Sequence, residues 1–185
     1  MKKIYFAIIA LAALTLASCE KDPIGGTAVQ ALAGQWYVQV DGYDTVGDSV
    51  VVPDFNDGRF LLLTYNNSAN DPDKLYVTDM GGFWDFTVQA ACDVNTLTFG
   101  SKDTLDNESY DCKVALTNGK IVKNGIKTPN GALADYIQFD INFDDDDLAN
   151  YGMPGVSYGQ YFGFDVYRVS GWRYSGLKDN GEDLE

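Results

Sequence analysis

Tyr136-Ile137-Gln138-Phe139-Asp140-Ile141-Asn142-Phe143 carries an apolar side chain at every second position. Because successive side chains of a strand point to opposite faces, this period of two predicts a strand with one buried and one wet face. Residues 84–90 show the same period, with polar residues separating Trp84, Phe86, Val88 and Ala90. Burial on one face is typical of antiparallel sheets, so the pattern indicates the fold class.

The rest of the chain consists of short segments rich in β-branched and aromatic residues, separated by Gly, Asn and Asp clusters. No helical period longer than two turns stands out. Asp93-Val94-Asn95 and Asn118-Gly119 are turn sequences that predict hairpins. We expect an all-β antiparallel meander barrel of about eight to ten strands, because closure removes exposed edges, with an open β-sandwich as the alternative. The expected strands are residues 35–41, 46–52, 59–65, 74–79, 83–91, 96–100, 110–118, 120–124, 134–143 and 160–169.

Residues 1–18 have the pattern of a bacterial secretory signal peptide, with two lysines followed by an apolar run. Leu16-Ala17-Ser18-Cys19 resembles the lipobox of lipoproteins, in which the cysteine is lipidated and the chain is cut before it. The apolar run of 15 residues, 4–18, is too short for a membrane-spanning helix. We therefore expect a lipid anchor on Cys19, against the alternative of an ordinary cleaved signal peptide.

The residues after Cys19 predict location and domain boundaries. Glu20-Lys21-Asp22 looks like the short acidic signal that directs many Bacteroidetes lipoproteins to the outer face of the outer membrane. We expect a cell-surface protein, with the periplasmic face as the alternative. Residues 19–33 contain Pro23, Gly25 and Gly26 without an apolar period, which is typical of a tether. We expect one barrel domain over residues 34–177 and an acidic tail over residues 178–185.

The charge balance narrows the class of partner. The chain holds 13 basic and 27 acidic residues, and removal of residues 1–18 deletes two of the lysines, which leaves 11 − 27 = −16. The basic residues are scattered singly, so no patch for a polyanion is expected and nucleic acid is excluded as a partner. The remaining partners are the membrane, through the anchor, and a ligand of the barrel; the sequence identifies no protein partner.

The chain has no histidine, which removes the commonest general base, the catalytic triads and imidazole-ligated zinc. A hydrolase of this composition would need two carboxylates, for which the candidates are Asp85, Asp140 and Asp165 on the polar faces of expected strands. No other catalytic motif and no cofactor is expected. The sequence thus favours a protein that is not an enzyme.

The densest charge run is Asp144-Asp145-Asp146-Asp147, directly after an expected strand. Four adjacent carboxylates are candidate calcium ligands, although the alternating spacing of known calcium loops is missing. The alternative is a solvated loop between strands.

Cys92 and Cys112 remain as an even pair once Cys19 carries lipid. In an oxidising compartment such a pair either forms a disulfide or stays as two buried thiols, and the spacing leaves both alternatives open.

Gly34-Gln35-Trp36, at the start of the first expected strand, resembles the Gly-x-Trp signature of lipocalins and the wider calycin group. The resemblance implies that the tryptophan closes one barrel end beneath an arginine from the end of the last strand. Arg168 and Arg173 are the two candidates for this position. A planar, weakly hydrated guanidinium stacks well on an indole face.

Aromatic residues make up 14% of the chain. We expect four of them inside the barrel, where they either fill the core or line a ligand cavity. These four candidate ligand-binding residues are Trp84, Phe86, Phe139 and Phe164.

A wider resemblance rests on four motifs that occur in order: Leu63-Thr64-Tyr65-Asn66, Phe83-Trp84-Asp85-Phe86, Leu116-Thr117-Asn118-Gly119-Lys120-Ile121 and Gly171-Trp172-Arg173-Tyr174-Ser175-Gly176-Leu177. Together with the lipobox they resemble the Bacteroidetes lipoprotein family of lipid-binding putative hydrolases, which are lipocalin-like. Trp172 and Tyr174 replace a histidine and an arginine of the ending expected for that family, so no role of that histidine carries over.

This resemblance implies an outer-membrane lipoprotein that binds a lipid or another small apolar ligand in a β-barrel. Two alternatives remain. One is a hydrolase that acts on glycans or esters through carboxylates, and the other is a surface subunit of an envelope complex.

Overall fold

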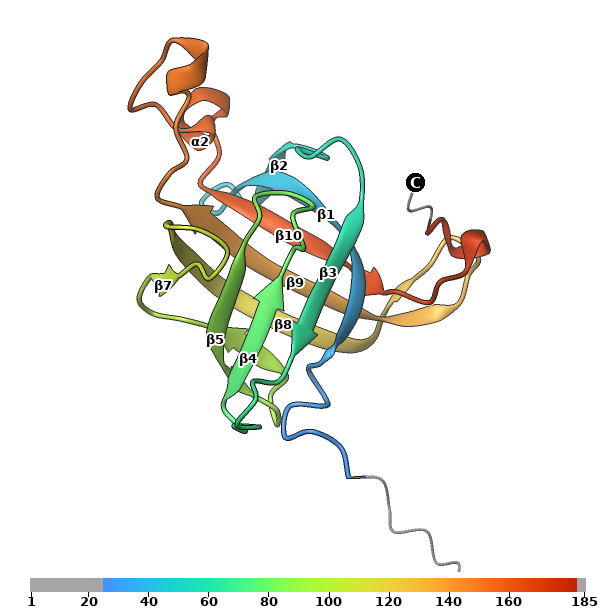
Figure 1. The fold of residues 1–185 in the computed structure, drawn as a ribbon. Helices are drawn as coiled ribbons and strands as arrows, with labels where there is room; N and C mark the ends of the chain where they lie inside the picture. Colours follow the sequence, from blue (N-terminus) through green and yellow to red (C-terminus); the bar gives the residue numbers. More distant parts are fainter. Residues whose placement is uncertain (1–24, 183–185) are drawn as a thin grey trace, which may run out of the picture.

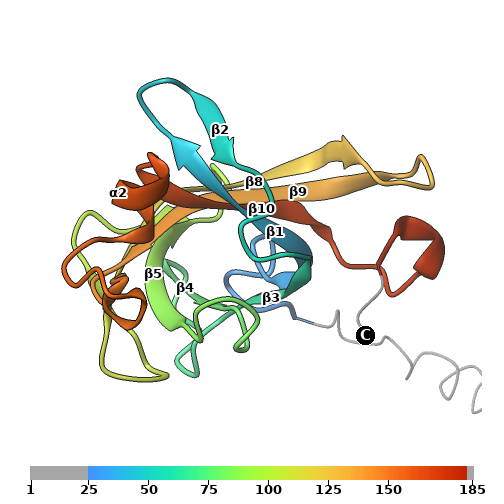
Figure 2. The same cartoon turned by 90° about the horizontal axis from the view of Figure 1, so that it is seen from above.

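A computed structural model describes residues 25–182, so Cys19, the signal peptide and residues 183–185 of the tail lie outside the described residues. The expected all-β barrel is confirmed: eight antiparallel strands close into a barrel, with two further strands, β2 and β7, attached to it. Figures 1 and 2 show the strands curving around a single axis. The strands are β1 Gly34–Asp44, β2 Ser49–Val52, β3 Phe60–Tyr65, β4 Lys74–Thr78, β5 Thr87–Asp93, β6 Thr98–Gly100, β7 Leu105–Asp106, β8 Lys113–Lys127, β9 Leu133–Phe143 and β10 Val166–Arg173.

Helical segments are short and lie in the loops. Among residues 25–182, no helix has the length and the apolar character that crossing a bilayer requires. The segments are the 3-10 helix η1 Ala149–Tyr151, the α-helix α2 Tyr158–Phe162 and the 3-10 helix η2 Lys178–Asn180.

The barrel closes where the first strand pairs with the last. β1 and β10 are antiparallel over eight residue pairs, from Trp36 opposite Arg173 to Tyr43 opposite Val166. β1 also pairs with β3, and β9 lies between β10 and β8. Ile137, Phe139 and Ile141 of β9 are fully buried, as their period of two predicted. Closure leaves the barrel without the long unpaired edges of an open sandwich.

The barrel interior is occupied by the chain's own side chains. Its buried residues form one continuous cluster to which almost every strand contributes. Phe99 of β6 and Phe139 of β9 face each other with ring centroids 5.7 Å apart. Leu62, Val88 and Leu116 have no solvent-exposed surface. The interior is therefore a packed core, as the dimensions of an eight-stranded barrel allow.

The hairpin predicted at Asn118-Gly119 is wrong. These residues lie within the single strand β8, whose register against β9 shifts between Thr117 and Lys120. Asn118 has a φ of 55°, the left-handed conformation that asparagine tolerates in a bulge as well as in a turn. Its side-chain amide donates to Asp140 across the strand pair, which holds the bulge in place.

The strand predicted over residues 160–169 is also wrong in its first part. Residues 158–162 form α2, which starts with a capping box in which Ser157 and Gln160 each accept the other's backbone N–H. The strand begins only at Val166. Local capping chemistry therefore determines the structure where the apolar residues alone suggested a strand.

The barrel end where β1 begins is closed by the preceding residues and Trp36. Val29 and Leu32 are fully buried, so the domain begins before Gly34 and the expected tether is shorter than residues 19–33. The Trp36 indole N–H donates to the Thr64 hydroxyl at 2.9 Å, and that hydroxyl donates to the Leu32 carbonyl at 2.6 Å. This chain of hydrogen bonds ties the entering segment to β1 and β3.

Arg173 covers Trp36 from outside. Its guanidinium carbon lies 4.3 Å from the indole centroid, and its N–H groups donate to the Ala33 carbonyl and the Asp135 carboxylate. Gly34 makes room for it, because a Cβ at that position would lie 2.1 Å from the Arg173 Nη1 atom. Arg173, and not Arg168, thus occupies the position over the tryptophan.

The C-terminal residues up to 182 pack on the barrel, although the sequence suggested a free acidic tail. Glu182 is 4% exposed and accepts hydrogen bonds from the Trp172 indole and from the backbone and hydroxyl of Ser175. Burial opposes its ionisation, but these donors together outweigh burial and lower the pKa of Glu182. Glu182 therefore accepts hydrogen bonds within the folded domain and does not belong to a free tail.

We expect Arg173→Met to destabilise the fold by about 2 kcal/mol, because it removes the cation over Trp36 and leaves Asp135 with one partner fewer. Thermal unfolding should show a loss of about 4 °C. The control is Lys74→Met, which removes an exposed cation on β4. Equal melting temperatures for the two variants would contradict this role of Arg173.

Candidate functional site: the aromatic mouth of the barrel

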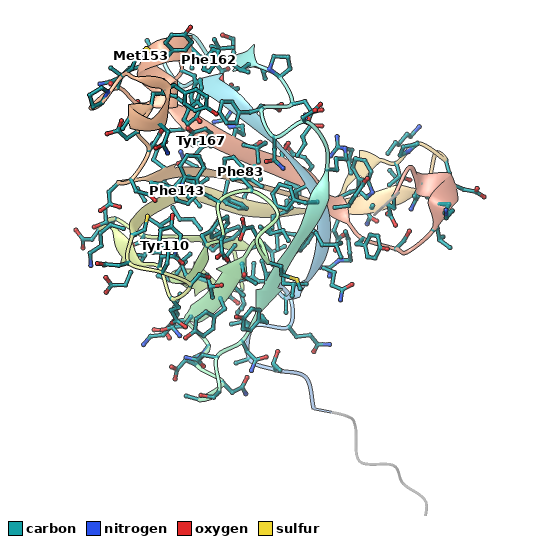
Figure 3. All side chains as sticks on the ribbon, turned by 45° about the horizontal axis from the view of Figure 1, so that its top comes forward. Phe83, Tyr110, Phe143, Met153, Phe162 and Tyr167 are labelled. Atoms are coloured by element: carbon teal, nitrogen blue, oxygen red, sulfur yellow. The ribbon has the colours of Figure 1, made fainter. Side chains whose placement is uncertain are left out.

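The open end of the barrel, opposite Trp36, carries a cluster of aromatic side chains that we call the aromatic mouth. Trp84 stacks on Phe143 with centroids 4.7 Å apart, and Tyr167 contacts Phe55 at 5.1 Å and Phe83 at 5.3 Å. Figure 3 shows Phe83, Phe143 and Tyr167 converging above the core. The mouth consists of Phe55, Phe83, Trp84, Phe143, Phe164 and Tyr167.

The loop that brings Phe83 and Trp84 to the mouth is shaped by one buried carboxylate. Asp79 directly follows β4 and is 1% exposed. A carboxylate that accepts several backbone N–H groups fixes a tight loop and is itself compensated for burial. Its two oxygens accept the backbone N–H groups of Gly81, Phe83, Trp84, Asp85 and Phe86 at 2.7–3.1 Å.

The four aspartates after β9 serve separate structural roles. Asp144 accepts the Lys113 backbone N–H, and Asp147 accepts that of Gly155. Asp146 accepts the Tyr158 backbone N–H and the Tyr167 hydroxyl at 2.9–3.0 Å. Of the four candidate calcium ligands, only Asp144 and Asp145 come together, beside the Cys112 thiol. The run anchors loops of the mouth to one another.

Asp145 joins three loops of the mouth. It accepts the Trp84 indole N–H at 3.0 Å, the Tyr110 hydroxyl at 2.7 Å and the Cys112 thiol at 3.2 Å. Burial opposes its ionisation, but the donors outweigh it and lower the pKa of Asp145. Burial and the same carboxylate raise the pKa of Tyr110. A stably charged Asp145 therefore holds Trp84 in its stacked position.

Cys92 and Cys112 are free thiols in the structure; Cys112 is buried and Cys92 is partly buried. The Cys92 thiol lies near the Pro72 carbonyl, and the Cys112 thiol donates to Asp145. Burial raises the pKa of Cys92 to about 11 and, together with hydrogen bonds to acids, that of Cys112 to about 12. Both thiols are weak nucleophiles at neutral pH.

The loop between β9 and β10, residues 144–165, rises from the mouth and carries η1 and α2 (Figure 1). It carries an open apolar pocket of about 290 Å³, which we call the loop groove, lined by Leu148, Tyr151, Met153, Tyr158, Tyr161 and Phe162. Figure 3 places Met153 and Phe162 at the tip of this loop. The groove is continuous with the mouth, because Tyr158 contacts Phe55 at 5.5 Å and Trp84 at 6.3 Å.

The four candidate ligand-binding residues fall into two groups. Phe86 and Phe139 are fully buried in the core. Trp84 and Phe164 belong to the mouth, where Trp84 is only partly buried. Trp84 does not lie on a strand, because β5 begins at Thr87. Its alternation with Phe86 comes from the Asp79 loop and not from a pleated strand.

Arg168 lies on the outer wall of the barrel. It forms a two-point ion pair with Asp140, at 2.7 and 3.1 Å, and its guanidinium carbon lies 3.3 Å from the Tyr43 ring centroid. Asp140 has no exposed side-chain surface. This pair supports the β9–β10 contact away from Trp36.

Two of the three carboxylates considered for hydrolysis, Asp140 and Asp165, are bound by other groups of the protein. Asp140 is held by Arg168 and Asn118. Asp165 accepts the Thr45 hydroxyl and backbone N–H, and these bonds lower its pKa. A general acid of a glycosidase needs a raised pKa, so Asp165 has the opposite electrostatics. Asp85 lies in the Asp79 loop with a φ of 56°.

The family model of lipid-binding putative hydrolases matches residues 21–178. The chain belongs to this family. The match covers most of the sequence, including the aromatic mouth and the whole loop groove, and it confirms the resemblance seen in the sequence motifs. No curated protein sequence matches the chain.

In this member of the lipid-binding putative hydrolase family, several residues of the candidate site were not predicted from the sequence. Tyr151, Met153, Tyr158 and Phe162 lie in a loop, where no period marks them. The sequence feature that could have indicated them is the high density of aromatic residues, because residues 148–164 contain five aromatic residues and no charged one. No sequence pattern identified Asp79, since its role depends on the loop that folds around its carboxylate.

We expect Asp79→Asn to destabilise the protein by about 3 kcal/mol, because an amide offers one acceptor oxygen where five N–H groups need two. Chemical unfolding measures the loss, and Trp84 fluorescence should shift to longer wavelength as its loop opens. The matched control is Asp103→Asn, an exposed aspartate on the segment between β6 and β7. Similar stability of both variants would show that Asp79 does not hold the loop.

Proposed function

We propose that the protein binds one lipid or similar small apolar ligand at the aromatic mouth and loop groove, and not inside the barrel. The family to which the chain belongs is described as lipid-binding, which supports a lipid as the ligand. The interior is filled by buried side chains, so it offers no comparable surface. The ligand site is therefore expected where apolar side chains reach the solvent.

The observation that carries this proposal is the exposure of the groove. Tyr151 is 71% exposed, Tyr161 57% and Phe162 45%, and all three line one apolar pocket. Soluble domains rarely gather large apolar side chains on one exposed loop unless the loop binds something. Leu148 is buried at the base of the groove, so a bound alkyl chain would replace water on an apolar surface.

We also propose that the protein is a lipoprotein anchored through Cys19 to the outer membrane. The lipobox-like residues 16–19 and the acidic residues that follow support this location. The described chain enters the barrel at the end away from α2 (Figures 1 and 2). The first described residues therefore lie away from the mouth.

The binding test uses the chain from residue 20 onward, which keeps every described residue, and dodecyl maltoside as an uncharged probe below its micelle concentration. We expect one bound molecule by calorimetry or native mass spectrometry, and no binding of free maltose. Tyr151→Ser combined with Phe162→Ser should weaken binding about tenfold, because it removes apolar contact area.

The matched control is Leu133→Ser, which removes an apolar side chain 60% exposed on the distant β8–β9 hairpin. It should bind like the parent protein. Equal weakening by both variants, or no saturable binding to the parent, would contradict a lipid site in the loop groove.

Anchoring is tested in a Gram-negative host that expresses the full chain. We expect Cys19→Ala to move the protein from the membrane fraction to the soluble fraction and to remove the mass of the lipid. The control Cys92→Ala, which keeps the lipobox, should stay in the membrane fraction. An unmodified Cys19 in the parent protein would contradict the proposal.

A further inference from the structure

We infer that the loop groove selects an amphiphile whose headgroup is positively charged. The inference rests on the proposed function, since it names the class of lipid that the same groove takes. Two features of the groove support it: the shape of its apolar floor and the negative charge at its rim.

The floor accommodates one slender chain. The groove has a volume of about 290 Å³, which lies at the lower end of small-molecule sites. It is bounded by Tyr158 and Phe162, whose rings are parallel at 6.5 Å, with Leu148 at the base. Tyr158 also stacks edge-on against Tyr151 at 6.4 Å. Such a site suits a single alkyl chain and is too small for a lipid with several chains.

The rim is acidic and has no basic residue nearby in the sequence. Asp146 binds the backbone of Tyr158, and Asp147 binds that of Gly155, so both carboxylates lie against the loop that forms the groove. No Lys or Arg occurs between Lys127 and Arg168, and the chain has no His. Arg168 itself is paired with Asp140 on the outer wall.

The other segments at this end of the barrel, which include β2 and β7, add to the same negative charge. Together with residues 144–165, residues 44–59, 79–86 and 101–113 hold 15 acidic and three basic residues. Two of the three basic residues have partners, since Lys113 pairs with Asp106 and Arg59 stacks on Trp172 of β10; the third, Lys102, is exposed. Summed fields of one sign concentrate ligands of the opposite sign and repel those of the same sign.

Aromatic rings and carboxylates are the groups that recognise an organic cation. The faces of Tyr and Phe attract an ammonium group, and nearby carboxylates supply the opposite charge. The exposed rings of Tyr151 and Tyr161 lie at the groove surface, where a headgroup would emerge. A carboxylate or phosphate headgroup would meet only like charge there. Charge complementarity thus decides between amphiphiles of equal chain length.

The test compares three probes with the same 12-carbon chain: dodecyltrimethylammonium, dodecyl maltoside and dodecyl sulfate, all below their micelle concentrations and at low salt. We expect the ammonium probe to bind about tenfold more tightly than the maltoside, and the sulfate to bind weakest. Added salt should narrow these differences, because it screens exposed charges. Circular dichroism checks that the fold is kept in each probe.

Asp147→Asn is the diagnostic variant, since the amide oxygen can still accept the Gly155 N–H while the charge is lost. We expect it to reduce ammonium binding about threefold and to leave maltoside binding unchanged. The matched control is Asp179→Asn, which removes an exposed charge in η2 at the far end of the barrel and should change neither probe.

The outcomes separate this inference from the proposed function. Equal binding of all three probes, or tightest binding of the sulfate, overturns the charge preference and leaves the lipid site intact. Ammonium binding that is equally sensitive to Asp147→Asn and Asp179→Asn overturns the inference as well. If no probe binds, or if binding is unchanged in the double variant Tyr151→Ser with Phe162→Ser, both the inference and the proposed function fail.

Discussion

The pairing of β1 with β10 closes the barrel, and the positions of the other parts depend on it. Closure brings Trp36 opposite Arg173, so that the indole, the guanidinium and the segment with Val29 and Leu32 close one end. It also encloses a space that the inward-facing side chains of an eight-stranded barrel can fill. One end is closed and the interior is packed, so we place the proposed ligand site at the other end. The aromatic mouth and its loop lie there.

Three carboxylates, of which Asp79 is buried and Asp145 and Asp146 are not, organise that end. Asp79 holds the loop of Phe83 and Trp84, Asp145 joins three loops, and Asp146 binds both the β9–β10 loop and Tyr167. Each accepts N–H or O–H donors that a loop would otherwise leave unsatisfied. The acidic composition therefore has two roles. Some acids hold loop backbone in place, and these and the other acids of the same segments together place negative charge at the mouth.

The sequence predicted the barrel and its closure better than the loops of the aromatic mouth. The period of two in residues 136–143 identified β9 because both strand faces are defined there by packing. The hairpin predicted at Asn118-Gly119 is wrong because a bulge and a turn require the same backbone conformation. Residues 83–86 alternate like a strand, but Asp79 bends them into a loop through hydrogen bonds that no period reveals. The sequence places Glu182 in a free tail because its partners, Trp172 and Ser175, meet it only in the folded protein. Strand pairing can be predicted from an apolar pattern that repeats along the chain, whereas the conformation of a loop depends on the hydrogen bonds of single residues.

The barrel is a filled scaffold, and the proposed ligand site lies outside its core. Backbone and methyl chemical shifts, recorded by NMR during titration with dodecyltrimethylammonium, test this most directly. We expect shift changes to concentrate in residues 144–165, with smaller ones in residues 53–59 and 79–86. Changes centred on Leu116, Ile137 and Ile141, deep in the core, would show that the ligand enters the barrel and would contradict the account.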